Sequence, residues 1–111
     1  HLEIACLRSL GLAARYVSGY ICNERRIAAP GAAPANDAGM VGADASHAWL
    51  ACWDGADGWL DVDPTNDCIA GLMHVTVAWG RDYADVCPVK GVCVGGGRHR
   101  MDVAVHVSRI G

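Results

Sequence analysis

The chain has 111 residues, of which 52% are hydrophobic and 19% are charged, and its formal net charge is −3. This length suits one core, so we expect a single domain over residues 1–111, and the apolar fraction excludes an intrinsically disordered chain. The acidic balance gives no electrostatic reason to bind nucleic acid or an anionic membrane, and no apolar run is long enough to span one.

Residues 1–10 have the apolar spacing of a helix that packs firmly into a core. Gly11 is placed to end this helix, and Cys6 falls on the apolar side, as a small buried hydrophobe would. The chain starts at His1 rather than at a Met, inside the helix. We therefore expect a fragment that lacks the beginning of this helix.

Residues 14–22 alternate in the manner of a strand, and residues 23–45 then lose all periodicity. This second segment is rich in Ala, Gly and Pro, and it leads directly to His47. Loops of this length in a small domain are uncommon and are either functional or disordered. A flap over a functional site and a poorly ordered segment both remain open.

Two alternating segments, residues 46–53 and 59–63, flank a turn-rich stretch at residues 54–58. The period of two and the aromatic content are typical of strands, and the Asp and Gly residues between them suit a turn. This pattern predicts a β-hairpin in which His47 and Asp63 share a face.

Two hairpin registers are possible. Pairing of Trp53 with Asp57 puts His47 directly opposite Asp63, whereas pairing of Trp53 with Trp59 makes the two diagonal neighbours. Both registers leave the side chains on one face, with Cβ atoms roughly 5 to 8 Å apart. A histidine oriented by a carboxylate forms two members of a nucleophilic triad, although such a pair can also be purely structural.

The rest of the chain adds further strands. A helix followed by antiparallel strands predicts the α+β class. In chain order we expect a connection at 67–73, a strand at 74–79, a loop at 80–88, a short strand at 89–94, a glycine turn at 95–97 and a closing strand at 100–110.

The six cysteines do not have the spacing of a small disulfide scaffold. They form no C-x-x-C motif and show no ligand-like spacing with the histidines, so we expect neither a metal site nor a cofactor. Reduced thiols in a cytoplasmic protein are the expected state.

Four segments, which cover most of the chain, resemble the bacterial transglutaminase-like superfamily, whose members are often labelled cysteine proteases. They read ACLRSLGLAARYVSGYI, SHAWLACW, GWLDVDPTND and HVTVAWGRDYADVCPVKGV. The resemblance implies a papain-like α+β fold, the transglutaminase core, with one helix packed on an antiparallel sheet. It also implies a Cys-His-Asp triad in which His47 and Asp63 are the catalytic histidine and aspartate.

The family's nucleophilic cysteine lies in a G-x-C-x-D-like segment at the start of the helix. That position precedes His1, so the resemblance implies that the chain lacks its nucleophile and that none of the six cysteines replaces it. Trp49 is either a wall of the site that contacts substrate or a core tryptophan. We expect ion pairs to fix the loop that contains Arg81, Asp82 and Asp85.

The function implied by the resemblance is acyl transfer or hydrolysis at an amide bond of a peptide or protein, through a thioester. The alternative is a non-catalytic transglutaminase-fold module that binds a partner. Residues 1–111 alone are expected to be inactive and to self-associate or fold poorly, because part of the helix is missing.

Overall fold

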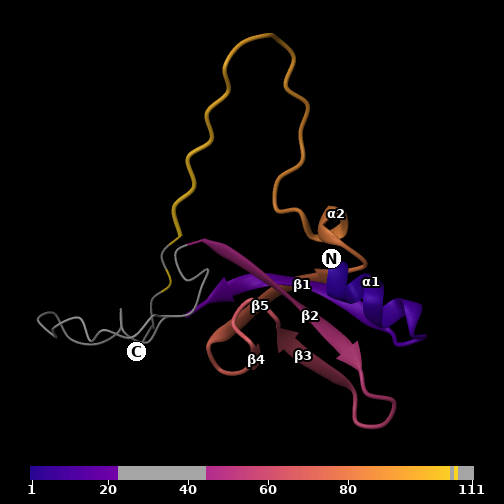
Figure 1. Cartoon of the computed structure of the whole chain (residues 1–111). Coiled ribbons are helices and arrows are strands. Elements are labelled where there is room, and N and C mark those ends of the chain that lie inside the picture. The colour runs from indigo at the N-terminus through magenta and orange to yellow at the C-terminus, as the bar shows by residue number, and fades with distance from the viewer. Residues whose placement is uncertain (23–44, 106, 108–111) are drawn as a thin grey trace, which may run out of the picture.

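The computed structural model describes residues 1–22, 45–105 and 107 (Figure 1). Five strands form one antiparallel sheet in the order β4-β3-β2-β1-β5, which confirms the α+β class. The elements are α1 (Leu2–Ser9), β1 (Ala14–Ile21), β2 (Ser46–Trp53), β3 (Trp59–Asp63), β4 (Cys68–Ile69), β5 (His74–Gly80) and α2 (Tyr83–Val86).

Local sequence accounts for the first helix and for the hairpin. Gly11 follows α1 with φ +80°, a conformation that glycine adopts without strain. In the hairpin turn, one carboxylate oxygen of Asp54 accepts hydrogen bonds from the backbone N–H groups of Ala56, Asp57 and Gly58. Because a single side chain satisfies three turn donors, the two strands are held close together.

The hairpin adopts the second of the two predicted registers. Trp53 pairs with Trp59, and Leu50 pairs with Val62. In this register His47 and Asp63 are diagonal neighbours across β2 and β3, so their contact depends on how the side chains lean.

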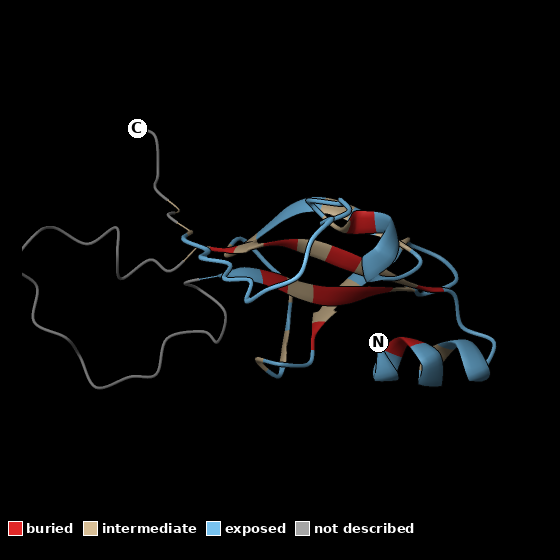
Figure 2. Ribbon diagram, turned by 90° about the horizontal axis from the view of Figure 1, so that it is seen from above, coloured by how far each residue is buried: buried red, intermediate tan, exposed pale blue. Residues whose placement is uncertain are grey.

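The sheet has a core cluster on each face, and β2 contributes to both. On one face Leu50 packs with Ile4 of α1 and with Ala14. On the other face Trp49 packs with Val17 and Ala51. Figure 2 shows the buried residues along the middle of the strands and α1 beneath one side of the sheet.

The connection from β4 to β5 has to cross the sheet, because these two strands are its opposite edges. Ala70 of this crossover packs on the cluster that contains Trp49, and the backbone carbonyl of Met73 accepts a hydrogen bond from the N–H of Cys22. The crossover therefore covers the same face that carries His47. It delivers β5 to the far side of β1.

Two predicted loops contain short regular elements. The connection predicted at 67–73 includes β4, which pairs with the end of β3. The loop predicted at 80–88 includes α2, whose first turn is capped by the Asp82 carboxylate accepting from the N–H of Ala84. Both elements are too short to leave a periodic signal in the sequence.

The two strands predicted near the end of the chain are wrong for the described residues. Residues 89–105 contain no strand, and Met101 is 85% exposed (Figure 1). An isolated two-stranded hairpin is only marginally stable, and residues 89–105 pair with no strand of the described sheet. Residues 23–44 and His106 lie outside the described residues, so the expectations about the long loop stay predictions.

None of the helices in the described ranges is long and apolar enough to cross a membrane.

Candidate active site

His47 and Asp63 meet in the hairpin, as the shared face predicts. The Nε2 atom of His47 lies 2.8 Å from Oδ2 of Asp63. Asp63 is completely buried and His47 is 8% exposed. Since an ionised carboxylate can only accept, Nε2 of His47 carries the proton and Nδ1 is left as the basic nitrogen. The contact is confirmed, while the catalytic roles of the two residues stay predictions.

The segment after β3 folds back to satisfy the Asp63 carboxylate. Its Oδ1 atom accepts from the backbone N–H groups of Thr65 and Asn66, at 3.1 and 3.3 Å. Its Oδ2 atom accepts from the Asn66 side-chain amide at 2.7 Å. A proline follows Asp63 and ends the strand, which leaves the next residues free to form this turn.

A second histidine reaches the same carboxylate. The Nε2 atom of His74 lies 3.0 Å from Oδ2 of Asp63, and the His74 side chain is 4% exposed. The backbone N–H of Gly71 donates to Nδ1 of His74 at 3.2 Å. From the sequence, His74 is predicted only as the first residue of a strand. No local signal could have found it, because only the crossover between β4 and β5 brings it to β3.

These contacts set the charge of Asp63. Burial alone would raise the pKa of this carboxyl, but hydrogen bonds from Asn66, His74 and His47 outweigh it and lower the pKa to about 2. Asp63 is therefore an anion at neutral pH. A buried anion beside His47 stabilises the imidazolium that forms when this ring takes up a proton.

Trp49 lies beneath both imidazoles and is 3% exposed. Its ring centroid is 6.1 Å from that of His47 and 5.0 Å from that of His74, and its Nε1–H donates to Asp61 at 2.9 Å. This burial agrees with the alternative that Trp49 is a core tryptophan. The role of Trp49 in substrate binding stays a prediction, while Asp61 helps to fix the position of this ring.

Gly19 of β1 makes room for this arrangement. It pairs with His47 across the sheet, and a Cβ atom there would lie 2.0 Å from the carbonyl oxygen of Val75 and 2.7 Å from Cη2 of Trp49. Only a glycine lets β5 and the Trp49 ring approach this closely.

The thiol of Cys68 lies beside this cluster. Ligand atoms of Asp63, Cys68 and His74 lie within 4.8 Å of one another, although spacing along the chain had suggested no metal site. Both nitrogens of His74 are engaged, however, and its Nε2 carries a proton directed at Asp63. The ring thus has no basic nitrogen for the Cys68 thiol, and a metal ion could bind Nε2 only by displacing its proton and its hydrogen bond to Asp63.

All six cysteines are free, including Cys6, which is exposed. The expectation that Cys6 is buried in the core is therefore wrong. The apolar face of α1 is narrower than the sequence suggested, and Ile4 is its only buried residue within Leu2–Ser9.

The first turn of α1 and the segment after Asp63 line a common cavity. This hollow has a volume of about 190 Å³, and the body of the helix packs on the face opposite His47. The turn after β3 therefore connects the helix N-terminus with the His47–Asp63 pair. The cavity is lined by His1, Glu3, Ile4, Tyr16, Ala48, Trp49, Leu50, Pro64 and Thr65.

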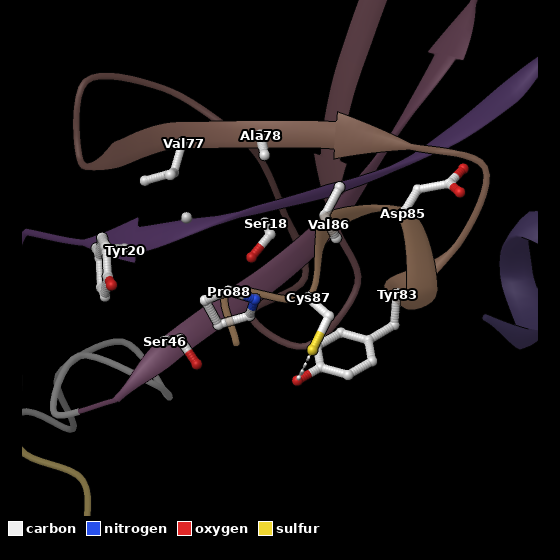
Figure 3. Close-up of a pocket in the computed structure, with 11 residues that line it drawn as sticks. Ser18, Tyr20, Ser46, Val77, Ala78, Tyr83, Asp85, Val86, Cys87 and Pro88 are labelled. Atoms are coloured by element: carbon white, nitrogen blue, oxygen red, sulfur yellow. Dashed lines mark hydrogen bonds between the residues drawn. The ribbon is translucent and has the colours of Figure 1, made fainter. Parts of the chain in front are cut away.

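A larger hollow of about 300 Å³ lies between α2 and the sheet (Figure 3). Its lining includes Cys87, whose thiol lies 3.6 Å from the Tyr83 hydroxyl, but no histidine. At its margin, Asp85 accepts from both the Nε and the terminal nitrogen of Arg81 at 2.9 Å. The predicted ion pair in this loop is confirmed for Arg81 and Asp85.

Comparison with known protein families identifies one family for this chain, whereas comparison with solved structures finds no match. The family model described as "Transglutaminase-like superfamily" matches residues 1–64, the part that includes both His47 and Asp63. No solved structure matches the chain.

The similar curated proteins are mycobacterial and carry the name "uncharacterized protein". One from Mycobacterium leprae is 40% identical over 110 residues, which cover 99% of this chain and 36% of that protein. One from Mycobacterium tuberculosis is 44% identical over 95 residues, which cover 82% of this chain and 28% of that protein. The chain thus spans about a third of the length of these relatives.

Proposed function

The chain belongs to the transglutaminase-like superfamily, and from that premise we propose that it is the His-Asp part of a thiol-dependent enzyme acting on amide bonds. The proposed reaction is acyl transfer or hydrolysis through a thioester, on a papain-like scaffold. Peptides or proteins are the proposed substrates. The nucleophilic cysteine is proposed to lie in the full-length protein just before the residue numbered His1 here.

In this mechanism Nδ1 of His47 takes the thiol proton, and the thiolate attacks the amide carbonyl. Collapse of the tetrahedral adduct breaks the C–N bond, and the imidazolium returns the proton to the leaving amine. Water or a second amine then attacks the thioester, with Nδ1 acting again as base. Asp63 holds Nε2–H throughout and stabilises the positive charge on the ring.

The observation that carries the proposal is the buried His47–Asp63 contact, which leaves Nδ1 as the free nitrogen. The contact fixes one tautomer of His47, as a catalytic base requires. The cavity shared by His1, Pro64 and Thr65 supports the proposed direction of approach, because residues that continue α1 backwards would enter beside it. A thiol at that helix end would be held as thiolate by the helix dipole and His47.

Alkylation of the full-length protein tests the proposal without a known substrate. We expect iodoacetamide to modify one cysteine upstream of His1 far faster than the other thiols at pH 6, and we expect His47→Ala to abolish this selectivity. His99→Ala, at an exposed histidine outside the cluster, is the control and should leave it unchanged. Selective labelling that survives His47→Ala would overturn the mechanism, and a full-length sequence without an upstream cysteine would favour the binding module.

A further inference from the structure

One oxygen of Asp63 is surrounded by more donors than it can bind fully. Oδ2 lies 2.7 Å from the Asn66 amide nitrogen, 2.8 Å from Nε2 of His47 and 3.0 Å from Nε2 of His74. A carboxylate oxygen offers two lone pairs. The three donors therefore share them, and the position of each depends on the other two.

Among these donors, His74 has its ring fixed from both sides. The N–H of Gly71 points at Nδ1, so in the neutral ring the proton must sit on Nε2, directed at Asp63. The Trp49 ring packs against it in a T-shaped arrangement, with the centroids 5.0 Å apart and the planes at 79°. His74 is the first residue of β5, which does not belong to the hairpin, and its side chain is almost completely buried.

We propose that His74 is a positioning residue for His47: it holds Oδ2 of Asp63 in place, so that His47 keeps its proton on Nε2 and presents Nδ1 to the thiol. The role rests on the function proposed above. His74 does not touch the reacting atoms, because both its nitrogens are occupied. Among the described residues, the thiol of Cys68 also lies close to Asp63 and His74.

Two substitutions separate the two hydrogen bonds of His74. A glutamine amide nitrogen can occupy the place of Nε2, so His74→Gln keeps the donor to Asp63 and loses the acceptor for Gly71. The oxygen of asparagine can occupy the place of Nδ1, so His74→Asn keeps the acceptor and loses the donor. Each variant loses one of the two hydrogen bonds that the His74 ring makes, so the two variants should destabilise the fold to a similar extent.

The primary measurement is the tautomer of His47, from ¹⁵N chemical shifts of the full-length protein at a pH where the ring is neutral. We expect wild type and His74→Gln to show Nε2–H alone, and His74→Asn to show a mixture of Nε2–H and Nδ1–H. Equal spectra for the two variants would overturn the proposal. This readout does not require activity, so it distinguishes failure of the positioning role from failure of the proposed enzyme.

The second measurement is the alkylation rate of the upstream cysteine or, once a substrate is known, kcat and KM. We expect His74→Asn to lower kcat about tenfold with KM within about twofold of wild type, and His74→Gln to restore most of the loss. Equal losses in both variants, in proportion to their lowered melting temperatures, would show that His74 only supports the fold and would overturn the proposal.

Discussion

Two of the short carboxylate contacts in the described part of the chain differ mainly in where they lie. Asp63 and His47 are 2.8 Å apart inside the sheet, and Asp85 and Arg81 are 2.9 Å apart beside α2. The side chain of Asp63 is 0% exposed, whereas those of Asp85 and Arg81 are 31% and 84% exposed. Each carboxyl has its pKa lowered, in Asp85 by the guanidinium of Arg81.

A short distance between a carboxylate and its partner is therefore not enough to make a functional site. The outer pair, Asp85 and Arg81, lies in water, where screening by salt weakens it. Its role is to hold the loop before α2 in place. The inner pair, Asp63 and His47, is desolvated. Backbone N–H groups fix the Asp63 carboxylate and the ring of its partner His74, so the proton on His47 has one position. A protein uses such a buried, oriented pair for chemistry or for specificity, at a cost in desolvation.

The largest expected difference between the two regions is in activity. Asp63→Asn should lower the proposed acyl-transfer activity by about 10⁴-fold, because an amide donor would favour the wrong tautomer of His47. Asp85→Asn, the matched change in the outer pair, should leave it within about twofold. Initial rates of the full-length protein check this, and similar losses in both variants would remove the distinction drawn here.

The next effect concerns the glycines that flank the two pairs. Gly19→Ala should destabilise the protein by about 3 kcal/mol, because the new methyl group meets the Val75 backbone and the Trp49 ring. Gly80→Ala should destabilise the protein less than Gly19→Ala. Its methyl group meets the Asp85 side chain at 2.5 Å, in an exposed region that can shift. Urea unfolding of both variants measures the difference, and an equal loss would show that the region around β5 and α2 is as rigid as the core.

A third effect depends on pH. The pKa of Asp63 is about 2 in the folded protein, below its ordinary value near 4, so the folded state binds the proton less readily than the unfolded state. Asp63 therefore adds roughly 2 kcal/mol to the free energy of unfolding above about pH 4, and this contribution is lost as the pH falls towards 2. Urea midpoints between pH 6 and pH 2 should fall more steeply for wild type than for Asp63→Asn.

The smallest effect is expected from salt on the outer pair. Raising the ionic strength from 0.05 to about 0.5 M should reduce the small loss of melting temperature caused by Arg81→Ala, since exposed charges are screened. The loss caused by His47→Ala should change little with salt, because that contact is buried. A stronger salt response at His47 than at Arg81 would contradict the assignment of inner and outer pairs.

Much of this molecule follows from local pattern. The alternation of residues 46–53 and 59–63 located the hairpin to the residue, and placing His47 and Asp63 on one face required only the period of two. The register had two solutions, because Asp57 and Trp59 were both acceptable partners for Trp53, and pairing across the sheet selected one. The same alternation failed near Met101 and Val103, because a period of two describes a strand only where a neighbouring strand pairs with it.

By itself, the sequence determined the helix, the hairpin, the family and the pair formed by His47 and Asp63, since each depends on residues close together or on a motif. Only the tertiary structure decided that His74 completes this cluster, that Gly19 must be a glycine and that Cys68 lies beside the cluster. These facts depend on the crossover from β4 to β5, which brings together residues from opposite edges of the sheet. No spacing along the chain encodes that meeting, because it results from the packing of the crossover on the face that carries Trp49.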